Sequence, residues 1–237
     1  MCNYTRPPSS ASATSPPLPT RAPCGPDSPI TQAAYTYALT HLHPSILYHS
    51  LRVYLYAREI ATSKSTPTGL PPDLLLPPLD LDGDILLFVT ALFHDMGTSS
   101  SHDGEQRFEI CGADAAAKFL RSHAFDEAFV REVRVAIAVH TSPGIAEFLT
   151  PLSRALRQAV LLDFGRPGEG DAGLVDSRTV DRAEAQFPRG GIEKVLGDTV
   201  VEQGLRRPGK APKVSWPGVM VAASLAEPRW EGVNKAF

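Results

Sequence analysis

Four side chains of metal-ligand type stand out because their immediate neighbours in the sequence are apolar. They are His49, His94, Asp95 and Asp163. The histidine–aspartate pair directly follows the apolar stretch 85–93, and the last aspartate follows a second apolar stretch, 159–162. Burying imidazoles and carboxylates in such surroundings costs free energy unless they are paired or bind a metal. We therefore interpret the four residues as ligands of one divalent metal ion.

Two imidazoles and two carboxylates form a mixed nitrogen and oxygen shell that suits Zn²⁺, with Fe²⁺ or Mn²⁺ as alternatives. Water is expected to complete the shell, and the metal would lower the pKa of that water towards ~7. Each residue also has an ordinary interpretation. His49 alone could be a hydrogen-bonded core histidine, and Asp163 alone could be a carboxylate at a helix end. The joint pattern favours the metal.

Three further residues are candidates for the surroundings of the site. His140 ends a predicted helix with an apolar face, and it could be a catalytic base, a residue behind the ligands or a core histidine. Arg52 follows His49 by three residues and so shares its helical face, where it could anchor a ligand carboxylate or form a surface ion pair. Glu109 could bond a ligand imidazole or be an exposed helix carboxylate.

Helical periodicity accounts for most of the chain between residues 31 and 203. Apolar residues recur at spacings of three and four, and Asp84 is a plausible N-cap for the helix that leads to His94. The expected helices cover residues 31–42, 45–60, 85–96, 107–122, 129–140, 152–162, 176–186 and 192–203. Alternating β-branched runs are few. The predicted fold class is therefore all-α, a helical bundle around a buried metal site.

Composition divides the chain into three parts. Residues 1–29 are rich in Pro and Ser and have little to bury, so we expect a disordered leader. Residues 30–203 form the predicted domain. Residues 204–237 are predicted to be an irregular tail, because periodicity fades there and Pro and Gly return.

Charge and hydropathy narrow the function classes. A net charge of −3 and a pI of about 6.2 predict no nucleic-acid partner and no anionic membrane surface. The longest apolar run, 85–93, is too short to span a bilayer. Three cysteines without a CxxC spacing fit a reducing, cytoplasmic location. We expect a small-molecule substrate, and a homo-oligomer is left open.

In order along the chain, the segments HSLRV, ALFHDMGT and the later aspartate resemble the H…HD…D signature of the HD-domain metalloenzymes. Three further segments, Arg107–Ala113, Val139–His140 and Gln186–Arg189, resemble the cyanamide hydratase branch of this family, which is known from fungi. The resemblance extends over about residues 30–203. The segments that carry it are His49–Val53, Ala91–Thr98, Asp163, Arg107–Ala113, Val139–His140 and Gln186–Arg189.

The resemblance implies a zinc-dependent hydro-lyase that adds water to cyanamide and gives urea. It carries the metal ligands over to His49, His94, Asp95 and Asp163. It also implies catalytic positions, with Asp95 or His140 relaying a proton to the nitrile nitrogen while activated water attacks the nitrile carbon. The positions concerned are Asp95, His140, Thr98 and Glu109.

Two departures from the family pattern keep other functions open. Thr141–Gly144 stands where an acidic residue and a nearby glycine are usual, and the tail after Gly204 differs from the family's ending. One alternative is an HD-domain phosphohydrolase acting on a nucleotide, which would need cations to hold phosphate. Only Arg52, Arg107 and Lys118 are near the motifs. Another alternative is a non-catalytic HD-domain binding protein.

Overall fold

The computed structural model describes residues 18–62, 71–75, 77–168, 171, 173–226 and 229–233. Over these residues the chain is helical and contains no strand, which confirms the all-α fold class. The helices are α1 (Pro29–His41), α2 (Pro44–Thr62), α3 (Leu81–Phe93), α4 (Phe108–Ser122), α5 (Glu127–Val139), α6 (Ala146–Leu149), α7 (Pro151–Asp163), α8 (Ser177–Gln186), α9 (Ile192–Arg206) and α10 (Trp216–Ala226).

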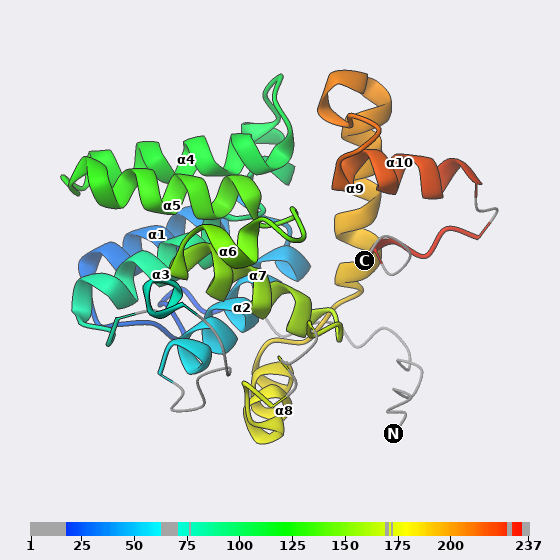
Figure 1. The fold of residues 1–237 in the computed structure, drawn as a ribbon. Helices are drawn as coiled ribbons and strands as arrows, with labels where there is room; N and C mark the ends of the chain where they lie inside the picture. Colours follow the sequence, from blue (N-terminus) through cyan, green and yellow to red (C-terminus); the bar gives the residue numbers. More distant parts are fainter. Residues whose placement is uncertain are drawn as a thin grey trace.

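Helices α2, α3 and α7 form the centre of the bundle. Ten consecutive residues of α3, Asp84–Phe93, are buried, and α2 is buried over Ser45–Tyr54. Figure 1 shows α4 and α5 side by side on one side of these helices, with α9 upright at the other side and α10 lying across its upper part. Because these stretches of α2 and α3 are covered on most sides, the polar side chains within them, such as His49 and Arg52, are removed from bulk water.

Helix α3 begins a full turn earlier than the sequence predicts. Its N-cap is Asp80, whose Oδ1 accepts a hydrogen bond of 2.8 Å from the Gly83 amide. Asp84 is therefore not the cap but a first-turn residue, and its Oδ1 accepts a hydrogen bond of 2.8 Å from the Tyr54 hydroxyl. The prediction missed this because three aspartates precede the apolar run, and the first of them, Asp80, also satisfies the cap pattern.

Two glycines let α3 and the turn after it approach α4 closely. A Cβ on Gly97 would lie 2.0 Å from the Phe108 carbonyl oxygen, and one on Gly112 would lie 2.7 Å from the Phe93 carbonyl oxygen. No side chain fits at either distance. The two glycines thus fix the position of the His94–Asp95 turn against the start of α4.

The ends of the chain are more ordered than expected. Residues 1–17 lie outside the described residues, but residues 18–28 lie on α1. The Tyr35 hydroxyl donates to the Pro19 carbonyl at 2.7 Å, and the Ala22 amide donates to the Gln32 side chain at 3.0 Å. The predicted disorder up to residue 29 therefore does not hold for this segment, because α1 supplies polar partners that composition alone does not reveal.

The predicted irregular tail also differs from the structure. Helix α9 runs on to Arg206, and α10 buries Trp216 and Met220. Prolines had suggested irregular structure, but Pro217 is in the first turn of α10, where a missing amide hydrogen costs nothing. Among the described helices, none combines the length and apolar character needed to cross a membrane.

Candidate metal centre

His49, His94 and Asp95 meet in the interior of the bundle. His49 comes from the middle of α2, and the other two form the turn directly after α3. Their accessible fractions are 0%, 0% and 1%. One ligand atom from each lies within 4.8 Å of the others, a grouping that could hold a metal ion. The structure thus brings together three of the four predicted ligands.

Hydrogen bonds behind the two imidazoles set which ring nitrogens face the cluster. Nδ1 of His94 is 2.7 Å from the Ala91 carbonyl oxygen, and Nδ1 of His49 is 2.7 Å from Asp163 Oδ2. Both partners can only accept, so both Nδ1 atoms donate and both Nε2 atoms present lone pairs. These two Nε2 atoms are 3.2 Å apart. Two lone pairs so close repel each other unless a cation lies between them.

Asp95 completes the fit to a metal. Its Oδ2 is 3.2 Å from His94 Nε2 and 3.7 Å from His49 Nε2, and it is buried without a hydrogen-bond partner among the described residues. Ligands about 2.0–2.1 Å from a tetrahedral ion are separated by about 3.3 Å. The measured separations are close to that value, so the residues present fit a divalent ion.

The pKa directions agree with this charge arrangement. Burial lowers the pKa of His49, despite the opposing hydrogen bond to Asp163. Burial also disfavours the charged form of His94, but the charge of Asp95 outweighs it and raises the pKa of His94. For Asp95, burial is outweighed by the charge of His94 and by the nearby imidazole of His140, which hold its pKa below the usual range. The raised pKa of His94 means that a proton competes with a metal ion for its Nε2.

Asp163 lies behind His49 and not in the cluster. Its Oδ1 accepts a bond of 2.6 Å from Arg52 Nε, and its Oδ2 accepts bonds from Arg52 Nη2 at 2.8 Å and from His49 Nδ1. Arg52 is itself fully buried. The sequence allowed Arg52 either to anchor a carboxylate or to form a surface ion pair. In the structure it anchors the carboxylate of Asp163. Asp163 therefore contacts His49, but it is not among the three residues whose ligand atoms cluster.

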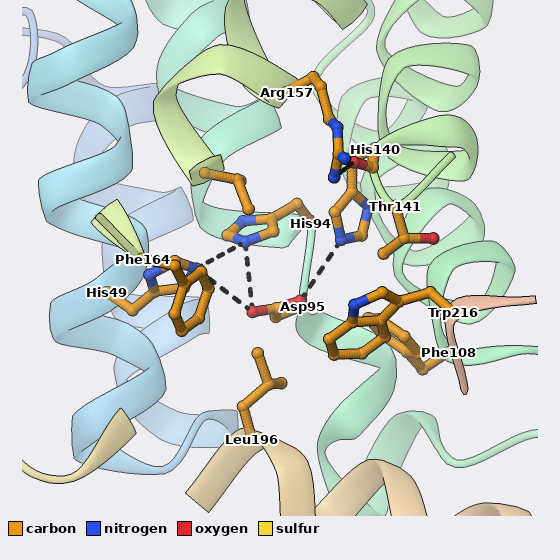
Figure 2. A pocket seen from close by; sticks show the side chains of 11 residues that line it. His49, His94, Asp95, Phe108, His140, Thr141, Arg157, Phe164, Leu196 and Trp216 are labelled. Carbon is orange, nitrogen blue, oxygen red and sulfur yellow. Dashed lines mark hydrogen bonds and ion pairs between the residues drawn. The ribbon is translucent and has the colours of Figure 1, made fainter. Parts of the chain in front are cut away.

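A small cavity opens beside Asp95, with His140 on its wall (Figure 2). Nδ1 of His140 donates to the Ile137 carbonyl at 2.7 Å, so its Nε2 faces Asp95 Oδ1 at 3.6 Å. About 10 Å³ of the cavity can hold the centre of a water molecule, which is room for about one ordered water. A molecule of a few atoms would need small movements of the walls, and a larger one would need extensive movements.

Much of the cavity wall comes from residues that the sequence did not single out. Apolar side chains surround the polar cluster, and Arg157 borders it while bonding Glu147 Oε1 at 3.1 Å and the His140 carbonyl at 3.2 Å. The other lining residues are Phe108, Thr141, Val160, Phe164, Leu196 and Trp216. Phe108 lies in the Arg107–Ala113 segment and Thr141 begins the Thr141–Gly144 segment, but the other four lie in no motif. Helical periodicity alone cannot tell a wall residue from a core residue.

Thr98 and Glu109, both predicted to be catalytic, do not line the cavity. The Thr98 hydroxyl donates to the Asp95 carbonyl at 2.6 Å and so supports the turn. Glu109 is fully buried, forms an ion pair with Arg107 and accepts a bond of 2.6 Å from the Thr141 hydroxyl. Both residues therefore act on the site through their neighbours. Glu109 is neither the exposed carboxylate nor the partner of a ligand imidazole that the sequence allowed.

Comparison with known proteins gives a family but no characterised relative. A search of curated proteins found no match to this chain. A scan against family models matches residues 46–189, more than half of the chain, to the HD domain. The matched region begins in α2 before His49 and ends after the segment that Arg52 contacts. The chain therefore belongs to the HD domain family.

Proposed function

We propose that the protein is a metal-dependent hydratase that adds water to cyanamide, or to a similarly small nitrile-like molecule. The observation that carries the proposal is the small cavity at the His49, His94 and Asp95 cluster. Zinc is the proposed metal, with Fe²⁺ or Mn²⁺ as alternatives, because the donors are imidazole and carboxylate. An uncharged substrate of three heavy atoms needs neither a large pocket nor free cations.

The residues of the cavity suit this addition. A divalent ion bound at the cluster would lower the pKa of a water molecule towards ~7 and make it a nucleophile at neutral pH. His140 Nε2 presents a lone pair to the cavity and can accept a proton as the water oxygen bonds to the nitrile carbon. The same imidazole can return that proton to the nitrile nitrogen. The product is isourea, which tautomerises to urea.

Nucleotide phosphohydrolysis is less well supported. Arg52 and Arg107 are paired with Asp163 and Glu109, and Lys118 borders a different cavity. Arg157 does line the site, but it is paired with Glu147. A cavity with room for about one water also cannot hold a nucleoside phosphate without large movements.

The test is urea release from cyanamide by purified, zinc-loaded protein, with nucleoside phosphates assayed in parallel for phosphate release. We expect urea, and we expect His94→Ala to lose both metal and turnover. His43→Asn is the matched control, because His43 is exposed and asparagine can still cap α2. Phosphate without urea would refute the proposal. Bound metal with neither product would favour a non-catalytic binding protein.

A further inference from the structure

We propose that Arg157 is a positioning residue, whose guanidinium group holds the backbone of His140 and so keeps the imidazole of that residue beside Asp95. This role rests on the proposed function, in which His140 accepts a proton from water in the cavity. How the protein holds this imidazole can nevertheless be measured without any turnover. Arg157 lies in none of the sequence motifs.

His140 is placed by the end of α5. It is the C-cap of that helix, and its Nδ1 donates to the Ile137 carbonyl, which leaves Nε2 facing Asp95. The chain soon turns away from the helix axis, because Pro143 and Gly144 follow and Gly144 has a φ of 72°. The last carbonyl groups of a helix have no amide partner within the helix. The His140 carbonyl therefore needs a donor from elsewhere in the bundle.

Arg157 supplies that donor from α7. Its Nη1 donates to the His140 carbonyl at 3.2 Å, and its Nε donates to Glu147 Oε1 at 3.1 Å. The Arg157 side chain is only 6% exposed, and Figure 2 shows it above His140. One planar group thus joins α7 to the end of α5 and to α6, and the carboxylate of Glu147 compensates the buried charge.

The contact acts on His140 specifically, because other bonds hold α6 against α7. Ser153 Oγ donates to the Ala146 carbonyl at 2.8 Å, and Thr150 and Ser153 form the capping box of α7. These bonds do not involve Arg157. Loss of Arg157 should therefore leave the helices in place and release the backbone at His140. The imidazole would then no longer be held at the cavity wall.

Small displacements of a proton acceptor have large effects on catalysis. A misplacement of about 1 Å, caused by a mutation away from the reacting atoms, can lower a rate by about 100-fold. His140 Nε2 is 3.6 Å from Asp95 Oδ1, so its place depends on the backbone that carries it. Arginine suits this task better than lysine, because its rigid fork of N–H groups can hold two acceptors at once.

The experiment measures how fast diethyl pyrocarbonate modifies each histidine in the wild type and in Arg157→Met, both with zinc present. Mass spectrometry of the peptides reports each histidine separately. His140 is 2% exposed, and its modification should be at least about 10-fold faster in the variant, the factor expected for the loss of one hydrogen bond from a charged donor. The fully buried His49 and His94 should stay protected in both proteins.

Arg154→Met is the matched control, because Arg154 lies three residues earlier on α7 and is paired with a different carboxylate. It should leave His140 as protected as in the wild type. If Arg157→Met also leaves His140 protected, Arg157 does not hold it and the inference is overturned. If His49 and His94 are modified together with His140, the substitution loosens the whole bundle, which overturns it as well.

Arg157→Lys gives the same test should Arg157→Met fail to fold. Lysine keeps the charge beside Glu147 but cannot hold both acceptors in one plane. We expect faster modification of His140 in this variant too, with His49 and His94 still protected. Protection of His140 equal to that in the wild type would overturn the inference.

Turnover provides a separate readout. We expect Arg157→Met to lower kcat for urea release by about 10–100-fold with little change in KM. Combined with His140→Ala it should cause no further loss, because both substitutions remove the same aligned imidazole. An additive loss would overturn the inference. No urea from the wild type would refute the proposed function instead, and the modification rates would still decide whether Arg157 holds His140.

Discussion

Replacing Arg52 by methionine is the most informative perturbation of the scaffold behind the site. Methionine keeps much of the side-chain length and removes the charge. Arg52 is fully buried and donates to both oxygens of Asp163 and to the carbonyls of Phe187 and Pro188. All four acceptors lose a donor at once, so the effect should far exceed that of an ordinary surface substitution.

The size of the effect follows from the charge left behind. Removing one partner of a buried ion pair typically costs about 3–5 kcal/mol, because the remaining charge is desolvated and unpaired. We expect Arg52→Met to lower the free energy of unfolding of the metal-free protein by that amount at pH 7. Urea denaturation followed by circular dichroism measures it. Arg58→Met is the matched control, because the Arg58 side chain is 54% exposed and should cost less than about 1 kcal/mol.

The pH dependence of the free energy of unfolding provides a second, independent test of this reasoning. In the wild type the charge of Arg52 outweighs burial and holds the pKa of Asp163 below its usual value of 3.8. The stability from this depressed pKa is present above pH 3.8 and is lost only as the pH falls below it. In Arg52→Met, burial instead raises the pKa of Asp163, and protonation then favours the folded state.

The stability difference between the wild type and Arg52→Met should therefore narrow between pH 7 and pH 5. A destabilisation of less than about 1 kcal/mol would contradict the buried-pair reasoning. So would a difference that widens as the pH falls.

Three further predictions concern the size of the cavity, the stability of α10 and the affinity for metal. Trp216→Ala should destabilise the protein by about 3–5 kcal/mol in urea denaturation and admit larger nitriles, and amide release from a bulkier nitrile tests the second effect. Asp103→Asn should lower the free energy of unfolding by about 1–3 kcal/mol and speed amide hydrogen exchange in α10, because Asp103 accepts a hydrogen bond of 2.6 Å from the buried Lys210. Unchanged exchange in α10 would contradict this role of Asp103. Metal affinity, followed by calorimetric titration, should fall as the pH drops through the raised pKa of His94, because a protonated imidazole cannot be a ligand; affinity that is constant below pH 6.5 would exclude His94.

The sequence predicted the framework of the site well because the framework is local. Helical periodicity located α2 and α3, and apolar neighbours pointed to His49 and to the His94–Asp95 turn. These three residues converge in the structure. Spacing could not reveal that Asp163 lies behind His49, since that placement depends on Arg52, and on a contact across more than a hundred residues of chain.

The part of the cavity wall formed by Leu196 and Trp216 could not be predicted from the sequence for a similar reason. Leu196 and Trp216 line the cavity from beyond the region that matches the HD domain. Prolines between α9 and α10 made this part of the sequence look irregular, and no local pattern shows that Trp216 packs against Phe108, with 5.9 Å between ring centroids. Size selection at the site therefore depends on tertiary packing that only the structure displays.

The central claim is that the cluster of His49, His94 and Asp95 binds one divalent metal ion. Calorimetric titration of Zn²⁺ into the metal-free protein tests it most directly, with His94→Ala as the comparison. We expect one tightly bound ion per chain in the wild type and a loss of that binding in the variant. Equal binding by both proteins, or no binding by the wild type, would contradict it.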